Sequence, residues 1–411
     1  MNKTYNEIYS FISSLPVFST HEHMMDDSYF EDFSLDKIIA KSYISWCNVE
    51  PGNNGKTRKD FLDKVKFNSY YVWIEKAIGY IYYSQDPFEA DAVKSFRITD
   101  ENWEEISKKI KEKHTKPGFH IDILKNTGNY RWIVQDTYWS PGSDLGHPDI
   151  FRPAYRINMM LSGYHPESFD HNGNSPYEIY GIKPASLEDY VDWIRNKIIE
   201  ERQKGCVALK SALAYDRCIY YSEVSVDEAK KVFGKHPSEV SKKQKILFGD
   251  YIFHKICEFA QELDIPFQNH TGLALIGGSN PMNLEPVIAK YPKLRFIIFH
   301  GGYPWIHEVA GLAHNYPNVY PDLCWLPLIS PSAAVQSVKE YIETTQTIDK
   351  IAWGSDSHVP EESFGAILAF RYILSKALSE FVDDRYITLD RAIELAEKIV
   401  YKNGLKIYLA N

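Results

Sequence analysis

Eight short apolar runs, each of a length typical of a buried strand, recur along the chain, and helical patterns separate most of them. Buried strands that alternate with amphipathic helices form a parallel sheet, because a helix must carry the chain back to the start of the next strand. Eight such units predict a (β/α)8 barrel, in which functional residues lie at the C-terminal ends of the strands. The predicted strands are 15–20, 131–139, 154–161, 206–215, 265–272, 294–302, 318–325 and 351–358.

The region 24–130, between the first two predicted strands, is dominated by helical patterns such as ENWEEISKKIKEKH. A chain of 411 residues is longer than a typical domain, but it matches one α/β barrel that carries an insertion. We therefore predict a single barrel domain over 1–411 with a helical insertion at 24–130.

Composition restricts the partners of the protein. A formal charge of −9 argues against nucleic acid, because phosphate backbones select clustered lysines and arginines. No stretch approaches about 18 continuous apolar residues, and the N-terminal segment has no signal-peptide pattern, so we expect no membrane partner. The five cysteines are odd in number and widely spaced, which is typical of reduced thiols. These features predict a cytoplasmic protein with a small-molecule substrate.

Polar side chains stand where the predicted strands end. They are His21 and His23 after the first strand, Lys210 near the end of the fourth, His270 after the fifth, His300 after the sixth and Asp356 after the eighth. Side chains two residues apart on a strand share a face, so both histidines of the HxH pair can reach the barrel axis. Three imidazoles and one carboxylate, from His21, His23, His270 and Asp356, fit Zn²⁺, Mn²⁺ or Fe²⁺ better than Ca²⁺.

Each of these residues also has a purely structural interpretation. Asp356 could cap the helix that follows it, and Lys210 could be a solvated lysine. The coincidence of all of them at the ends of strands favours a metal site. His358, two residues after Asp356, could also approach the substrate, whereas the remaining histidines lie in helical, charged or loop contexts and receive no role.

The HxH pair, the histidines of the fifth and sixth strands and the aspartate of the eighth resemble the amidohydrolase superfamily. Between about 205 and 370, the motifs PFQNHTG, FIIFHGGYPW, LAHNYPNVYPDLCW and GSDSHVPEE resemble the amidohydrolase-related (amidohydrolase 2) domain found at the N-terminus of FluG-type proteins. The resemblance implies a distorted TIM barrel of the metal-dependent hydrolase type. It also implies that His300 polarises the substrate, orients water or binds a second metal ion.

The resemblance leaves the number of metal ions open. In binuclear amidohydrolases a lysine on the fourth strand is carboxylated and bridges two ions, and Lys210 occupies the matching segment. Alternatively, Lys210 is a cation for a substrate carboxylate. We favour one ion over two, with zinc as the first expectation and manganese or iron as alternatives.

The predicted function is metal-dependent hydrolysis of a small molecule, at an amide-type C–N bond, by activated water. In this interpretation Asp356 moves the proton as general base and acid, and His300 stabilises the developing oxyanion. Further candidates for binding the substrate, each with a structural alternative, are Arg156, Lys210, Arg217, Tyr303 and Trp305.

Two other functional classes stay open at this point. One is a single-metal decarboxylase or uronate-isomerase-like enzyme on the same scaffold. The other is a non-catalytic binding module, against which the intact set of ligands argues. A homo-oligomer formed through the helical insertion is a further possibility.

Overall fold

The computed structural model describes residues 2–85 and 96–410. The described residues form a seven-stranded, entirely parallel sheet in which the strands follow one another in chain order. The strands are β1 (Val17–Glu22), β2 (Tyr130–Gln135), β3 (Phe151–Arg156), β4 (Ala208–Ser211), β5 (Phe267–Asn269), β6 (Phe296–Ile298) and β7 (Val319–Pro321).

The structure confirms seven of the eight predicted strands. The third was placed too late, at 154–161, because its second half is the helix Asn158–Ser162, whose methionine and leucine side chains are as apolar as those of a strand. The predicted eighth strand, 351–358, is not a regular strand, and Ala352 forms one isolated parallel bridge with Asp322.

The 351–357 segment nevertheless forms backbone hydrogen bonds with both edges of the sheet. On one side Leu323 N donates to Ala352 O, at 2.9 Å. On the other side Thr20 N donates to Trp353 O at 3.0 Å, and Asp356 N donates to His21 O at 2.9 Å. Gly354 permits this approach, because a Cβ at that position would lie 2.6 Å from His21 N. The segment thereby lies against β1, at the point where the HxH pair is located.

The sheet is strongly curled. Arg156, Lys210 and Gln268 occupy matching positions on β3, β4 and β5. The Gln268 amide reaches β1, four strands away in the sheet order, where its Nε2 donates to Thr20 O at 2.9 Å. Since residues in register on parallel strands share a face, this contact places the three side chains on the concave face of the sheet.

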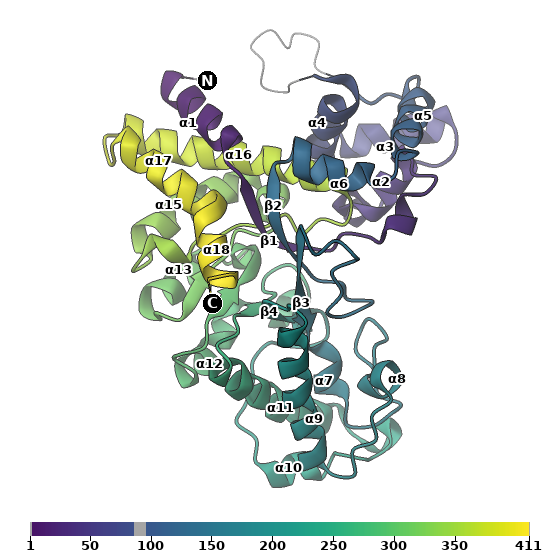
Figure 1. Cartoon of the computed structure of the whole chain (residues 1–411), viewed down its shortest axis with the longest axis vertical. Coiled ribbons are helices and arrows are strands. Elements are labelled where there is room, and N and C mark those ends of the chain that lie inside the picture. The colour runs from purple at the N-terminus through teal and green to yellow at the C-terminus, as the bar shows by residue number, and fades with distance from the viewer. Residues whose placement is uncertain (1, 86–95, 411) are drawn as a thin grey trace.

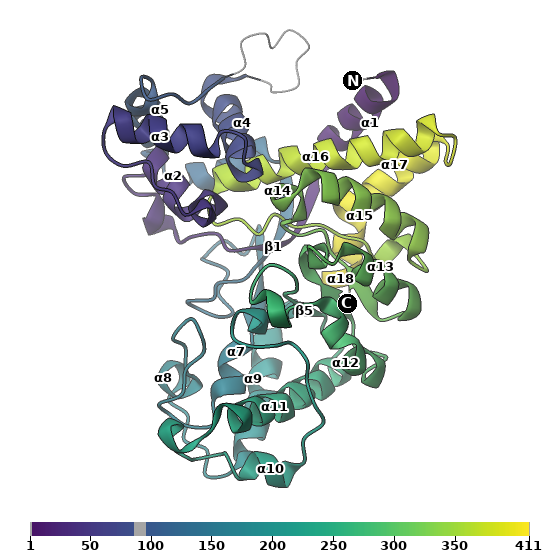
Figure 2. The same ribbon diagram turned by 180° about the vertical axis from the view of Figure 1, so that it is seen from behind.

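Helices surround the sheet (Figures 1 and 2). Both views show α9, α10 and α11 at the end of the molecule opposite to α1, α16 and α17. The helices are α1 (Lys3–Ser14), α2 (Leu35–Lys41), α3 (Gly55–Val65), α4 (Ser69–Tyr83), α5 (Trp103–His114), α6 (Phe119–Asp122), α7 (Asn158–Ser162), α8 (Pro176–Tyr180), α9 (Leu187–Gln203), α10 (Val226–Lys230), α11 (Lys242–Glu262), α12 (Glu285–Lys290), α13 (Ile306–Asn315), α14 (Leu326–Ile329), α15 (Pro331–Thr344), α16 (Pro360–Asp383), α17 (Leu389–Glu397) and α18 (Asn403–Tyr408).

The described part of the region between β1 and β2 is helical, as its sequence patterns predict, and it contains α2 to α6. Figure 1 shows these helices grouped beside α16, and α4 packs against that helix. A buried polar contact supports the packing, because Tyr82 of α4 donates to Glu361 of α16 at 2.5 Å. Among the described residues, no helix is both long and apolar enough to cross a bilayer.

Candidate metal centre

His21, His23 and Asp356 meet at the centre of the curled sheet. His21 Nε2 lies 3.5 Å from Asp356 Oδ1, and His23 Nε2 lies 3.4 Å from the same oxygen. All three side chains are buried. His21 Nε2 and Asp356 Oδ1 have no hydrogen-bond partner within the described ranges. Buried polar atoms are rarely left without a partner, so these two atoms fit the ligand atoms of a bound ion.

Both histidines of the HxH pair use their other ring nitrogen to donate a hydrogen bond. His23 Nδ1 donates to the main-chain carbonyl of Asp136, at 2.7 Å. His21 Nδ1 donates to Gln268 Oε1, at 3.1 Å. The orientation of that amide is fixed, because its nitrogen donates to Thr20 O. Both Nε2 atoms therefore carry lone pairs in the neutral rings, and metal-binding histidines have this same arrangement.

His270 and His300 also each donate a hydrogen bond from one ring nitrogen. His270 Nε2 donates to Leu273 O at 2.9 Å, and His300 Nδ1 donates to Cys324 O at 3.1 Å. The remaining nitrogens, His270 Nδ1 and His300 Nε2, lie 2.8 Å apart. Because both carbonyls can only accept, a hydrogen bond between the two rings would require one of them to be cationic.

Burial opposes that cationic state. It lowers the pKa of His270 well below the usual imidazole range and the pKa of His300 to about 4. Two neutral rings bring their lone pairs together at this contact, and such a contact needs a cation nearby. Neutral imidazole is the form that binds metal ions. The donor set at this position thus fits a divalent ion of the zinc class.

Two further ligand-type residues escaped the sequence prediction. Asp136, directly after β2, joins His21 and His23 in one group whose ligand atoms all lie within 4.8 Å of one another. Cys324, after β7, forms a second such group with His300 and Asp356. Asp136 follows a strand in the same way as the predicted ligands, so its position was a usable signal, whereas nothing local distinguishes Cys324.

Arg156 lies beside this centre, but its guanidinium is already bound. Its Nε donates to both oxygens of Asp136, at 3.0 and 3.2 Å, and a terminal nitrogen donates to Asp136 Oδ2 at 2.5 Å. The other terminal nitrogen donates to Asn172 Oδ1 at 3.3 Å. In this geometry Arg156 orients Asp136 rather than presenting an open fork to a substrate.

Lys210 is buried on the concave face of the sheet, and its Nζ lies 4.1 Å from the centre of the Phe299 ring. That ring in turn lies 4.9 Å from the His21 ring, so the amine is close to the predicted ligands. Burial lowers the pKa of Lys210 to about 8, against the opposing influence of Asp356 and Asp136. The amine therefore loses its proton more easily than an exposed lysine does.

Residues from other parts of the chain hold Asp356 and His358. The Tyr43 hydroxyl donates to Asp356 Oδ2 at 2.5 Å. Glu362, in the first turn of α16, accepts from Tyr43 N at 2.7 Å and from His358 N at 3.2 Å. The His358 ring lies 5.1 Å from that of His23, so the structure brings His358 to the centre. The roles of Tyr43 and Glu362 depend on tertiary contacts and had no signal in the sequence.

The guanidinium of Arg217, a predicted contact for a substrate carboxylate, is already bound within the fold. Every nitrogen of its guanidinium donates within the fold, to Cys218 O, Ile246 O, Tyr220 O and the Asp250 carboxylate. Tyr303 and Trp305 are half-buried. Within the described ranges, neither ring makes an aromatic contact with His21, His23, His270 or His300.

Unusual backbone conformations occur at three residues of this centre. His300, Trp325 and Asp356 have positive φ angles of 66°, 62° and 65°. Side chains other than glycine seldom adopt this region, and such strain is concentrated at functional sites. The surrounding hydrogen bonds hold these residues in place, which is consistent with a centre selected for geometry rather than for stability.

Comparison with known proteins relates part of the chain to one family. The amidohydrolase family model matches residues 230–408, which contain His270, His300 and Asp356. The resemblance to the amidohydrolase superfamily, predicted from the motifs, is thereby confirmed.

One relative is a protein of the FluG type, as the motifs also predicted. FluG of Emericella nidulans is 34% identical over 152 residues, which are 36% of this chain and 18% of FluG. The aligned region is thus less than a fifth of that protein.

Solved structures match the whole chain. Uronate isomerase from Thermotoga maritima covers 100% of this chain and 98% of its own, with a TM-score of 0.76 and 17% identity. Glucuronate isomerase from Caulobacter crescentus covers 98% and 93%, with a TM-score of 0.73 and 16% identity. A protein from Lactobacillus casei described as a metal-dependent hydrolase covers 98% and 97%, with a TM-score of 0.68 and 17% identity. At such identities the likeness establishes the fold.

Proposed function

We propose that the chain is a metal-dependent hydrolase that cleaves a small molecule at an amide-type C–N bond, with water as the nucleophile. One observation carries the proposal. The Nε2 atoms of His21 and His23 converge on Asp356 Oδ1 at 3.5 and 3.4 Å, while the other ring nitrogens donate to fixed acceptors. This arrangement is built for a divalent ion.

We assign His21, His23, His270 and Asp356 as the ligands of a single ion. The ion is most consistent with zinc, and manganese or iron would fit the same nitrogen and oxygen donors. When bound, such an ion lowers the pKa of water and polarises a carbonyl group. We also propose that residues 1–411 form one domain in which 24–130 is an insertion. A cytoplasmic location is consistent with this function.

Asp356 is the proposed proton carrier. Tyr43 holds the carboxylate through Oδ2, and a carboxylate beside the ion can accept a proton from the attacking water and return it to the leaving nitrogen. His300 was expected to stabilise the oxyanion. However, its Nδ1–H is committed to Cys324 O, so the neutral ring offers a lone pair at Nε2 rather than a hydrogen. We therefore assign oxyanion stabilisation to the Lys210 ammonium. For His300 we propose that its Nε2 lone pair faces the bound cation.

A single-metal isomerase or decarboxylase is the second candidate. Uronate isomerase structures match the whole chain, including the helices between β1 and β2, whereas the amidohydrolase family match begins at residue 230. Lys210 and His358 could bind a substrate carboxylate in either reaction.

The test is a substrate panel in ¹⁸O-labelled water, with zinc-loaded enzyme and an Asp356→Asn control. N-acyl compounds, lactams and lactones that bear a carboxylate would report hydrolysis through one incorporated ¹⁸O per turnover. Uronates would report isomerisation, and aromatic acids would report release of CO₂. In neither reaction would the product gain ¹⁸O beyond the amount that carbonyl oxygens exchange with water. Hydrolysis that disappears in Asp356→Asn supports the proposal, whereas turnover confined to the second set contradicts it.

A further inference from the structure

A second group of metal-type ligands lies outside the centre. His120 Nε2 and His147 Nε2 lie 2.9 and 2.8 Å from the same oxygen, Asp27 Oδ1. The three ligand atoms all lie within 4.8 Å of one another. Two ligands about 2.1 Å from one zinc ion lie roughly 3.0 to 3.4 Å apart, for coordination angles between 90° and tetrahedral. The two imidazole–carboxylate distances are thus slightly shorter than those in an occupied site.

The cluster is held by packing as well as by its own contacts. The His120 side chain is buried, and its ring stacks on Phe30 with centroids 4.4 Å apart and planes within 11°. His147 is three-quarters buried, and Asp27 is 60% exposed, so the group opens to solvent on one side. A buried and oriented imidazole next to a solvent-facing carboxylate leaves room for a water ligand.

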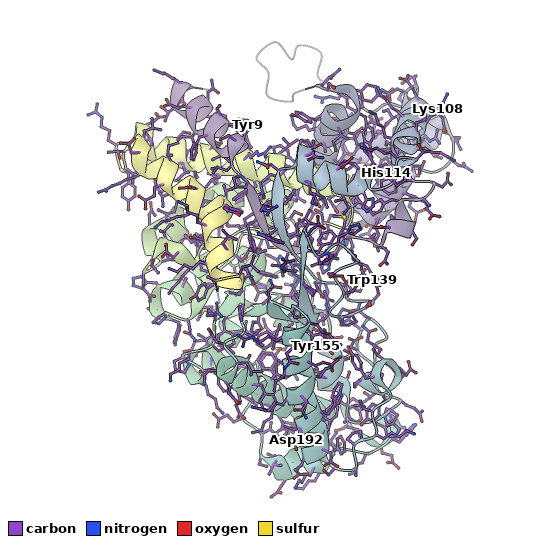
Figure 3. The ribbon with its side chains drawn as sticks, in the orientation of Figure 1. Tyr9, Lys108, His114, Trp139, Tyr155 and Asp192 are labelled. Carbon is purple, nitrogen blue, oxygen red and sulfur yellow. The ribbon has the colours of Figure 1, made fainter. Side chains whose placement is uncertain are left out.

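The three residues come from separate elements. Asp27 begins the short helix Asp27–Phe30 after β1, His120 lies in α6, and His147 lies in the loop between β2 and β3. The neighbouring residue Asp26 accepts from Trp139 Nε1 at 3.1 Å. Figure 3 shows Trp139 below His114. The cluster therefore joins the segments that leave the C-terminal ends of β1 and β2.

We propose that Asp27, His120 and His147 bind a second divalent ion of the zinc class, separate from the centre at His21, His23 and Asp356. Two imidazoles and a carboxylate, with water in the fourth position, match the preference of Zn²⁺. The ion would hold together two segments. One begins at Met24, directly after the predicted ligand His23, and the other begins at Asp136, directly after β2.

The experiment is a zinc titration of chelator-treated full-length protein, with stoichiometry read by calorimetry and by elemental analysis. The variants are His147→Asn and Asp27→Ala, both at partly exposed positions, so the fold does not depend on them as it does on His120. The matched control is His171→Asn, because His171 is equally exposed and forms a comparable pair with Asp216 Oδ1 at 2.9 Å.

We expect wild type and His171→Asn to bind one zinc ion more per chain than His147→Asn and Asp27→Ala. Zinc should also raise the melting temperature of wild type more than that of either variant. Equal stoichiometry in all four proteins would overturn the proposal and leave the cluster as two histidines hydrogen-bonded to one carboxylate. A His21→Asn variant keeps the two proposals apart, because it should lose the central ion and retain this one.

Discussion

The hydroxyl of Tyr43 donates a 2.5 Å hydrogen bond to Asp356 Oδ2, although 313 residues separate the two in the chain. The helical region between β1 and β2 thus reaches into the candidate metal centre and fixes one oxygen of its carboxylate. Tyr43 also stacks on Trp325, with ring centroids 4.3 Å apart, and Trp325 lies 5.4 Å from His300. This region is therefore part of the site rather than an appendage to the barrel.

Removing the Tyr43 hydroxyl tests this role. Tyr43→Phe keeps the ring that packs on Trp325 but frees Asp356 Oδ2 to rotate. We expect roughly a 10- to 100-fold loss of turnover or metal affinity, the usual effect of losing a partner that orients a ligand. The melting temperature should change little. Steady-state kinetics and zinc competition measure the effect, with the exposed Tyr386→Phe as control. Unchanged kinetics in Tyr43→Phe would show that Asp356 needs no such support.

Gln268 offers a second test of ligand orientation. Its Oε1 accepts the Nδ1 hydrogen of His21, so Gln268→Met leaves that hydrogen without a partner and the ring free to turn. We expect zinc to dissociate about 10 to 100 times more readily, as measured by competition with a chromophoric chelator. Gln261→Met, in which the lost bond is from Lys293 N near the surface, provides the control. Identical zinc affinities in the two variants would argue against His21 as a ligand.

Glu362 predicts a pH dependence of stability. Burial raises the pKa of this carboxyl from 4.5 to about 8. Between these values the folded protein retains a proton that the unfolded chain releases, so the free energy of unfolding falls as the pH rises through this interval. Glu362→Gln cannot titrate and should flatten the dependence. Urea unfolding at several pH values measures it.

The control for that experiment lies on the same helix. Glu380 pairs with Lys339 at 3.0 Å and is partly exposed, so Glu380→Gln should leave the pH dependence unchanged. Parallel curves for wild type and Glu362→Gln would contradict the prediction.

A variant of Lys210 tests whether the centre binds one ion or two. If Lys210 faces the substrate, Lys210→Ala should bind as much zinc as wild type while kcat/KM falls at least tenfold. Its cationic amine would then be missing from the developing oxyanion. If the lysine is carboxylated and bridges two ions, the variant should lose zinc. Elemental analysis of both proteins, purified side by side in the presence of bicarbonate, separates the two cases.

The sequence predicted which side chains would lie close together wherever the signal was local. Each of the predicted residues follows an apolar run, namely His21, His23, His270, His300 and Asp356. Because parallel strands end at the same edge of the sheet, residues at the ends of different strands lie close together. The same logic applies to Asp136, which was overlooked. Strand β3 was misplaced because the apolar residues of α7 continue its pattern without a break.

Other parts of the site depend on the tertiary fold alone. Tyr43 and Glu362 act through contacts between segments more than three hundred residues apart. The charge of Arg217 suggested a substrate contact, whereas in the fold each of its guanidinium nitrogens donates to a main-chain carbonyl or to Asp250. Charge type and spacing do not show whether a guanidinium is already paired.

The central claim is that His21, His23 and Asp356 hold a divalent ion. Zinc content per chain in wild type, in the double variant His21→Asn/His23→Asn and in Asp356→Asn tests it most directly, with His171→Asn as control. The account predicts that the double variant and Asp356→Asn each carry one ion fewer than wild type and the control, whatever the cluster at Asp27 binds. Equal zinc content in all four proteins would contradict it.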